Sequence, residues 1–261
     1  MNQDTPVVVS MDEAVGIIEL ARPEKFNCLS TAVAKGIEDA IDAFEKPGSG
    51  VRAILICAQG KCFSAGADLD EIKELRGNAD DLRRFLAYGH HMLNRLEASD
   101  LPVVAACQGL SLAGGIELML ACDMIFAAKD AQFADQHARF GFIPGWGGTQ
   151  RLPRVIGMRR GLDLILTGRR IDADTALQWG LVNYVVEPDK LRDAALEYCQ
   201  EFAKRSRTGI ATMKHAARRG REGSLEAGLT LELDLVSVAL LNDDVSEGLA
   251  AFEGRRAPKF R

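Results

Sequence analysis

Apolar runs of strand length recur along this chain, and helical patterns lie between them. The runs are nearly continuous in apolar residues instead of alternating with polar ones, which is typical of parallel strands that are covered on both faces. They cover residues 15–20, 51–57, 103–107, 124–128 and 181–186, and helical patterns such as residues 32–44 and 80–96 lie between them. This order of elements predicts an α/β fold.

The size and charge of the chain restrict the protein classes to which it can belong. Its 261 residues suffice for one large domain, and its net charge of −5 argues against a nucleic-acid binder. No apolar run is long enough to span a bilayer, and the first residues lack the features of a signal peptide, so we expect a cytoplasmic protein without membrane contact. The six cysteines form no CxxC pair, which predicts buried, reduced thiols and no metal site.

A short internal repeat points to two related turns. The segments "ICAQGKCFSAGADLDEI" and "AACQGLSLAGGIELML" each contain an apolar strand, a Gln-Gly pair, an Ala-Gly step and an acidic residue that opens a helix. Gly66-Ala67 corresponds to Gly114-Gly115, and Asp68 corresponds approximately to Glu117. The repeat predicts two strand-to-helix turns with similar backbone geometry.

The second segment, extended to "GLSLAGGIELMLACD", allows three interpretations. Ser111 resembles the nucleophile of a hydrolase, but its surroundings fall one residue short of G-x-S-x-G because Ala113 replaces the last glycine. The second interpretation is a phosphate-binding turn, but the required glycine spacing is absent and Glu117 would repel phosphate. The third is an oxyanion site beside an acid–base carboxylate.

The third interpretation uses every feature of the segment. Glu117 is the only charged residue between positions 109 and 121, and its helix is apolar on all sides. Burial of a carboxylate is unfavourable unless the group is paired or lies in a cleft. Gly114 and Gly115 leave the N–H groups at the helix start unshielded, and such groups can stabilise a developing oxyanion. We therefore favour an acid–base role for Glu117, with a structural carboxylate bonded to a neighbouring loop as the alternative.

The last part of the chain predicts helices with an unusual apolar surface. From residue 224 one helix carries two apolar stripes, at positions 225, 229, 233, 236 and 240 and at positions 231, 235 and 238. A helix that is apolar on two sides needs two partners, so a subunit contact is expected beside core packing. Asp244 and Glu247 predict a capping box for the next helix, which Gly254 can end.

Four segments together resemble the enoyl-CoA hydratase/isomerase (crotonase) superfamily. They are "GKCFSAGADLDEI", "GLSLAGGIELMLACD", "AQFADQHARFGFIPGWGGTQRLPRVIG" and "LTGRRIDADTALQWGLVNYVV", and the similarity extends from "LARPEKFNCLS" to the end of the chain. The resemblance implies a crotonase-like spiral of ββα units, with an acyl-CoA-binding core at residues 1–200 and a C-terminal helical trimerisation region at residues 201–261. It also implies homotrimers or hexamers, and no cofactor besides the coenzyme A of the substrate.

The resemblance also assigns residues to the site. It implies that the N–H groups of Ala67 and Gly114 form the oxyanion hole and that Glu117 is a catalytic carboxylate. The position of a second family glutamate is occupied here by His137, in the string Asp135-Gln136-His137. His137 either orients a water together with Glu117 or bonds Asp135 or the Arg139 loop and faces away from the thioester. The positions that match the CoA groove are Lys25, Ala67, Asp68, Leu69 and Asp70. Trp146 is expected in the wall of the acyl pocket, with ordinary packing in the core as the alternative.

We therefore expect an enzyme that hydrates a 2-enoyl-CoA through an enolate. Isomerisation of the double bond, thioester hydrolysis and decarboxylation remain as alternatives because they share that enolate. A CoA-binding protein with little catalysis is another, since one family acid is missing, and the Ser111 hydrolase is the weakest.

Overall fold

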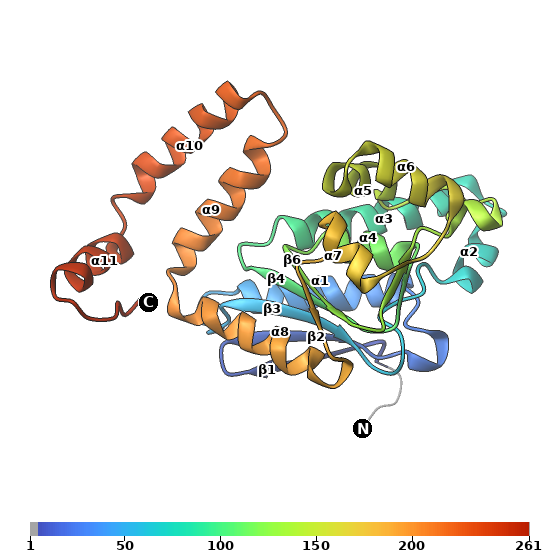
Figure 1. Cartoon of the computed structure of the whole chain (residues 1–261), viewed down its shortest axis with the longest axis horizontal. Coiled ribbons are helices and arrows are strands. Elements are labelled where there is room, and N and C mark those ends of the chain that lie inside the picture. Colours follow the sequence, from blue (N-terminus) through green and yellow to red (C-terminus); the bar gives the residue numbers. More distant parts are fainter. Residues whose placement is uncertain (1–4, 261) are drawn as a thin grey trace.

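The computed structural model describes residues 5–260, and its centre is a six-stranded sheet (Figure 1). The strands lie in the order β1, β2, β3, β4, β6, β9, and all neighbours are parallel except β1 and β2. Their bounds are β1 Val7–Asp12, β2 Val15–Leu20, β3 Ala53–Ala58, β4 Val103–Cys107, β6 Met124–Ala128 and β9 Tyr184–Val186. The predicted α/β class is confirmed.

A second, smaller sheet of three strands lies next to the large one in the chain order. It pairs β5 (Leu110–Leu112) with β7 (Gln132–Ala134) in parallel and β7 with β8 (Ile171–Asp172) in antiparallel. Isolated parallel bridges join Ser64 to Ser111 and Leu29 to Ala67. The segment after β3 therefore runs beside the segment after β4 and in the same direction. Each course continues into a short helix, α2 (Leu69–Leu75) or α4 (Gly114–Leu120).

Helices cover the large sheet and bury its central strands. Helix α1 packs on β1 and β2 and on α3, whereas α8 packs along β2, β3, β4 and β6. The further helices are α1 Thr31–Glu45, α3 Ala79–Glu97, α5 Gly148–Ile156, α6 Met158–Thr167, α7 Ala173–Trp179, α8 Leu191–Gln200, α9 Arg207–Gly220, α10 Leu225–Ala239 and α11 Asp243–Glu253. Short 3-10 turns are η1 Pro23–Lys25, η2 His137–Phe140, η3 Pro188–Lys190 and η4 Glu201–Lys204. All six cysteines are buried and free, as predicted.

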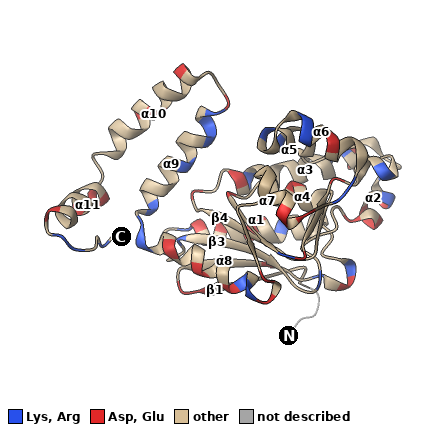
Figure 2. Ribbon diagram, in the orientation of Figure 1, with Lys and Arg blue, Asp and Glu red and all other residues tan. Residues whose placement is uncertain are grey.

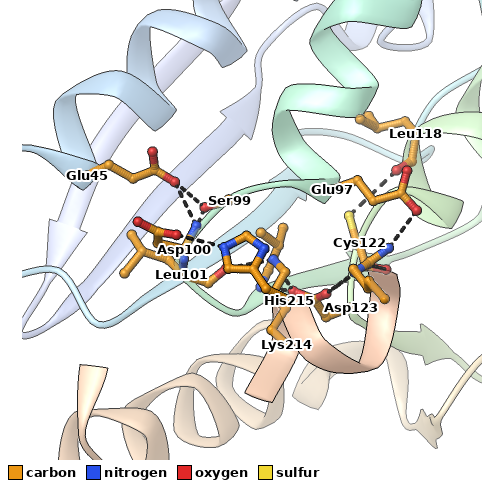
Figure 3. Close-up of polar contacts among 12 residues, drawn as sticks. Glu45, Glu97, Ser99, Asp100, Leu101, Leu118, Cys122, Asp123, Lys214 and His215 are labelled. Atoms are coloured by element: carbon orange, nitrogen blue, oxygen red, sulfur yellow. Dashed lines mark hydrogen bonds and ion pairs between the residues drawn. The ribbon is translucent and has the colours of Figure 1, made fainter. Parts of the chain in front are cut away.

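Helices α9, α10 and α11 form an arm that projects from the sheet and its covering helices (Figure 1). Helix α9 is fixed to the rest of the protein by ion pairs, of which one is largely buried (Figure 3). Lys214, whose side chain is 8% exposed, places Nζ 2.7 Å from Oδ2 of Asp123 and donates to the carbonyl of Leu101 at 2.9 Å. His215 Nε2 lies 2.8 Å from Oδ1 of Asp100. No helix among residues 5–260 has the length and apolar content to cross a bilayer.

Helix α10 presents an uncovered apolar stripe. It packs on α9 where Gly220 and Gly228 allow close approach, since an ideal Cβ on Gly228 would lie 3.1 Å from the carbonyl oxygen of Gly220. The predicted stripe of Leu225, Leu229, Leu233, Val236 and Leu240 stays exposed. Figure 2 shows few charged residues along α10, in contrast to the Lys and Arg of α9.

The start of α11 corrects the sequence prediction. The N-cap is Asn242, whose side chain accepts a hydrogen bond from the N–H of Asp244 at 3.0 Å, so the predicted capping box of Asp244 and Glu247 is wrong. Asparagine is as good an N-cap as aspartate, and Asn242 lies two residues closer to α10 than Asp244 does. Glu247 instead pairs with Arg256, and Gly254 ends the helix as predicted.

Candidate active site

The amides of Ala67 and Gly114 lie side by side, although they belong to different segments. An ideal Cβ on Gly66 would be 2.9 Å from the nitrogen of Gly114, and one on Gly114 would be 3.1 Å from the nitrogen of Ala67. A hydrogen bond from the Leu112 N–H to the Ser64 carbonyl (2.9 Å) holds the two turns together. Within residues 5–260 neither N–H has an acceptor in the protein, so both can bind one oxygen atom of a ligand.

The Gly114 amide is presented by a strained residue. Ala113 has φ 48° and ψ −115°, a conformation that favours glycine, and it caps the N-terminus of α4. Such a backbone conformation costs on the order of 1–3 kcal/mol and persists where its surroundings hold it. The Ala113 N–H donates to the carbonyl of Ala134 at 2.9 Å, so strand β7 fixes the turn.

Glu117 lies one turn into α4, and the whole residue is only 1% exposed. Its Oε1 accepts hydrogen bonds from the N–H groups of Trp146 (2.8 Å) and Gly148 (2.7 Å). Burial raises the pKa of this carboxyl, and the hydrogen bond from Gly148, the His137 ring and the hydrogen bond from Trp146 offset only part of that effect. Oε2 receives no hydrogen bond from residues 5–260, so one oxygen is held by the loop and the other is left for chemistry.

His137 and Asp135 form a close pair beside Glu117. Nδ1 of His137 lies 2.7 Å from Oδ1 of Asp135, and the exposed fractions of the two side chains are 13% and 0%. Burial lowers the pKa of His137, but the hydrogen bond and charge of Asp135, together with Glu117, raise it overall. Of the two arrangements considered for His137, the hydrogen bond to Asp135 is therefore present, and it uses Nδ1 and leaves Nε2 free.

Gly148 connects the three ionisable groups in space. An ideal Cβ on Gly148 would lie 3.1 Å from Oε1 of Glu117 and 3.2 Å from Oδ2 of Asp135. A side chain here would therefore push on both carboxylates. The carboxylates of α4 and of the loop after β7 thus face the same point, with His137 attached to one of them.

Trp146 closes the space on the other side of the two amides. Its ring packs against Phe85 with a centroid distance of 5.4 Å, and Cζ3 would be 3.0 Å from an ideal Cβ on Gly114. A cavity of about 10 Å³ remains beside the indole. Its lining residues are Leu29, Ser30, Thr31, Ala34, Phe85, Tyr88, Gly89, Met92 and Trp146. The tryptophan therefore fills most of the volume next to the oxyanion turns.

The residues expected in the CoA groove lie together at η1 and the start of α2. Lys25 Nζ is 3.1 Å from Oδ2 of Asp70, both side chains are exposed, and Leu69 is exposed beside them. Asp68 is different, because its carboxylate bonds Arg22 at 2.9 Å and caps α2. Burial acts to raise the pKa of Asp68, but hydrogen bonds from Arg22 and Cys28 lower it overall. The Asp68 side chain therefore has a structural task at this site.

The structure does not support Ser111 as a nucleophile. Ser111 is 0% exposed, and its Oγ has no hydrogen-bond partner within the described part of the chain, so no base can activate it. Across residues 5–260 no group of His, Cys, Asp and Glu has the arrangement of a metal site.

Sequence reasoning missed the support of the loop that holds Glu117. Arg151 on α5 donates from Nη1 to the carbonyl of Trp146 at 2.9 Å, and its Nε and Nη2 contact Oε2 of Glu97 at 3.0 and 2.8 Å. The other oxygen of Glu97 accepts from Arg218 of α9 at 2.5 Å. No local pattern signals these contacts, because the partners are far apart in the sequence.

Comparison with known proteins shows what the whole chain is similar to. The sequence profile described as enoyl-CoA hydratase/isomerase matches residues 10–261. The chain is 40% identical to a probable enoyl-CoA hydratase of Mycobacterium leprae, over 100% of this chain and 99% of the relative. It is 33% identical to the short-chain-enoyl-CoA hydratase of Clostridium acetobutylicum, over 98% and 97%. The crystal structure of the enoyl-CoA hydratase from Bacillus anthracis superposes with a TM-score of 0.92 at 33% identity, over 98% of each chain.

Proposed function

The chain belongs to the enoyl-CoA hydratase/isomerase family and is a hydratase-type enzyme, and we propose that it adds water to a 2-enoyl-CoA thioester with Glu117 as the acid–base group. The observation that carries the proposal is the position of the buried Glu117 carboxylate beside the Ala67 and Gly114 amides. Among residues 5–260, one oxygen of the carboxylate and both amide N–H groups have no hydrogen-bond partner. That combination suits a reaction in which charge develops on a carbonyl oxygen while a proton moves at the adjacent carbons.

The N–H groups of Ala67 and Gly114 would bind the thioester carbonyl oxygen. Negative charge grows on that oxygen as the enolate forms, and fixed donors stabilise it more strongly than they stabilise the neutral carbonyl. Removal of one such donor typically costs about 3–4 kcal/mol of transition-state stabilisation. The turn at Ala113 would thus contribute to catalysis by aiming one amide.

Glu117 and His137 would hold the water between them. The water donates one O–H to Oε2 of Glu117 and the other to Nε2 of His137, which leaves its oxygen lone pair directed at the β-carbon. As the C–O bond forms, the first proton passes to Glu117 and the π electrons of the double bond move into the enolate. Glu117 then returns this proton to the α-carbon, so that the product is a 3-hydroxyacyl-CoA. All atoms come from the substrate and water, and no further cofactor takes part.

The rest of the substrate would lie along the surface at η1 and α2. Lys25 supplies a cation near that surface, and the exposed Leu69 and Asp70 lie next to it. The acyl chain would lie against the ring of Trp146, which limits the length of chain that fits. We further propose that residues 1–200 form the catalytic core and residues 201–261 an oligomerisation region that assembles a homotrimer or hexamer, because the apolar stripe on α10 needs a covering surface.

Hydration of crotonyl-CoA tests the proposal directly. We expect loss of the enoyl absorbance, a product heavier by one water, and a decrease in kcat/KM of about 10²–10⁴-fold in the Glu117→Gln variant. Glu197→Gln, an exposed substitution on α8, serves as the matched control and should be neutral. Released CoA or a shifted double bond as the main outcome would overturn the hydratase proposal, as would full activity of Glu117→Gln.

A further inference from the structure

We propose that Asp135 is a positioning residue that acts through His137, by holding the imidazole in the tautomer that carries hydrogen on Nδ1. This inference rests on the proposed hydration of an enoyl-CoA. Its basis is the 2.7 Å contact between Nδ1 of His137 and Oδ1 of Asp135. A carboxylate only accepts hydrogen bonds, so Nδ1 must be the donor and Nε2 of the neutral ring keeps its lone pair.

The position of Asp135 in the fold is well determined. It follows β7 directly, and the carbonyl of the preceding Ala134 accepts from the N–H of Ala113 beside the oxyanion turn. Oδ1 of Asp135 also lies 3.3 Å from the backbone nitrogen of His137, so the loop returns onto the carboxylate. One short strand therefore aligns the turn that presents the Gly114 amide and the residue that orients the imidazole.

Burial makes the pairing of Asp135 necessary. The side chain is fully buried, and within residues 5–260 its Oδ2 has no hydrogen-bond partner. No Lys or Arg side chain forms an ion pair with Asp135 in that part of the chain, so His137 is its charge partner. An unpaired buried carboxylate is strongly unfavourable, and the imidazole N–H therefore stays on Oδ1.

The tautomer matters because it decides whether Nε2 accepts a hydrogen bond from a water or donates one to it. Nε2 with a lone pair accepts an O–H of the water and leaves the water oxygen free to attack. Nε2 with a hydrogen would instead donate to that oxygen, which withdraws electron density from it and makes it a weaker nucleophile. Asp135 thus selects the ring state in which His137 can assist Glu117, as a buried carboxylate does for a catalytic histidine in other enzymes.

The other charged groups around the ring do not replace Asp135. Glu117 on α4 is also acidic, and its Oε1 is occupied by two backbone donors. Arg139, on the same turn as His137, has its side chain against Gly168. On α6, which packs against η2, Arg160 lies over Trp179 and Asp163 pairs with Arg169.

The Asp135→Asn variant tests the inference by kinetics. We expect kcat for crotonyl-CoA hydration to decrease about 10- to 100-fold with KM changed less than threefold, because the amide also stabilises the opposite tautomer. The acid limb of the pH–rate profile should move to lower pH in the variant, since the carboxylate that favours the protonated ring is gone. Asp130→Asn, an exposed substitution before β7, is the matched control and should leave kcat and the profile unchanged.

A double-mutant cycle separates positioning from a general structural role. If Asp135 acts through His137, Asp135→Asn combined with His137→Gln should be no slower than His137→Gln alone. If the decreases in kcat of the two single variants multiply in the double variant, the inference is overturned. ¹⁵N spectra of labelled histidine, with the resonance assigned by its loss in His137→Gln, should show hydrogen on Nδ1 in the native enzyme and a mixture in Asp135→Asn. Hydrogen on Nε2 in the native enzyme would also overturn it.

These outcomes are distinct from a failure of the proposed function. Native enzyme that does not hydrate crotonyl-CoA, or full activity of Glu117→Gln, contradicts the hydratase proposal itself. Native hydration that is lost in Glu117→Gln but unchanged in Asp135→Asn contradicts only the role of Asp135.

Discussion

The indole of Trp146 occupies the space that a side chain at position 89 would need. An ideal Cβ on Gly89 would lie 2.1 Å from Nε1 of the ring, so helix α3 accepts the tryptophan only because residue 89 is glycine. The ring reaches from there to Gly114, where its Cζ3 would be 3.0 Å from an ideal Cβ. This pair of residues therefore limits the space beside the oxyanion turns.

Trp146→Ala should shift the substrate preference towards longer acyl chains. Removal of the indole opens a volume lined by apolar side chains, and each buried methylene contributes about 0.8 kcal/mol. We expect the ratio of kcat/KM for octenoyl-CoA over crotonyl-CoA to increase about 10-fold or more, measured by hydration assays. Trp179→Ala, on α7, controls for the loss of a tryptophan elsewhere. An unchanged ratio would show that Trp146 does not bound the acyl pocket.

Gly89→Ala should destabilise the protein through Trp146. The new methyl group collides with the ring, and overpacking of this kind costs about 1–3 kcal/mol. Urea unfolding should show this decrease in the free energy of unfolding. The same substitution in a Trp146→Ala background should decrease it much less. Equal losses in both backgrounds would mean that the methyl group acts on some other neighbour.

Glu117→Gln should make the protein more stable while it removes activity. The folded pKa of Glu117 lies above its ordinary value of 4.5, because burial penalises the charged form. Its stabilising contribution is therefore complete below pH 4.5 and is lost as pH rises through the folded pKa. Glutamine does not ionise and so has no such loss. The free energy of unfolding of the variant should therefore exceed that of the native protein by about 0.5–2 kcal/mol at pH 7 and equal it at pH 4. Urea unfolding at the two pH values measures the difference, and a gain that is independent of pH would contradict this account.

Leu233→Glu should break the assembly of subunits. Leu233 lies in the middle of the exposed stripe of α10, and a buried, unpaired carboxylate at a subunit contact is strongly unfavourable. Sedimentation velocity should show a species near 28.3 kDa for the variant and a larger one for the native protein. Glu226→Gln changes the charge by one unit on the same helix and should leave assembly intact. A native protein of 28.3 kDa would refute an oligomerising role for α10.

The strands that are buried on both faces could be predicted from the sequence. Strands β2, β4 and β6 have the predicted bounds, because continuous burial leaves a continuous apolar run. Strand β1 was missed because only Val7 of its six residues is buried. The short strands of the second sheet were missed because three residues or fewer carry no readable period.

The candidate site was predictable where a local pattern repeats. The internal repeat indicated the turns at Ala67 and Gly114, and the structure places their amides together. The loop donors to Glu117 were not predictable, because Trp146 and Gly148 are 29 and 31 residues away in sequence. The same holds for Arg151 and Glu97, whose contact depends on the packing of two helices.

The strained backbone of Ala113 has opposite effects on stability and on turnover. Glycine at this position would adopt φ 48° without steric penalty, and the folded protein would tolerate heat better. The same glycine would let the next peptide group swing, and the Gly114 amide would aim less accurately. Selection for heat resistance alone should therefore drift towards glycine at 113, and selection for speed should keep the methyl group.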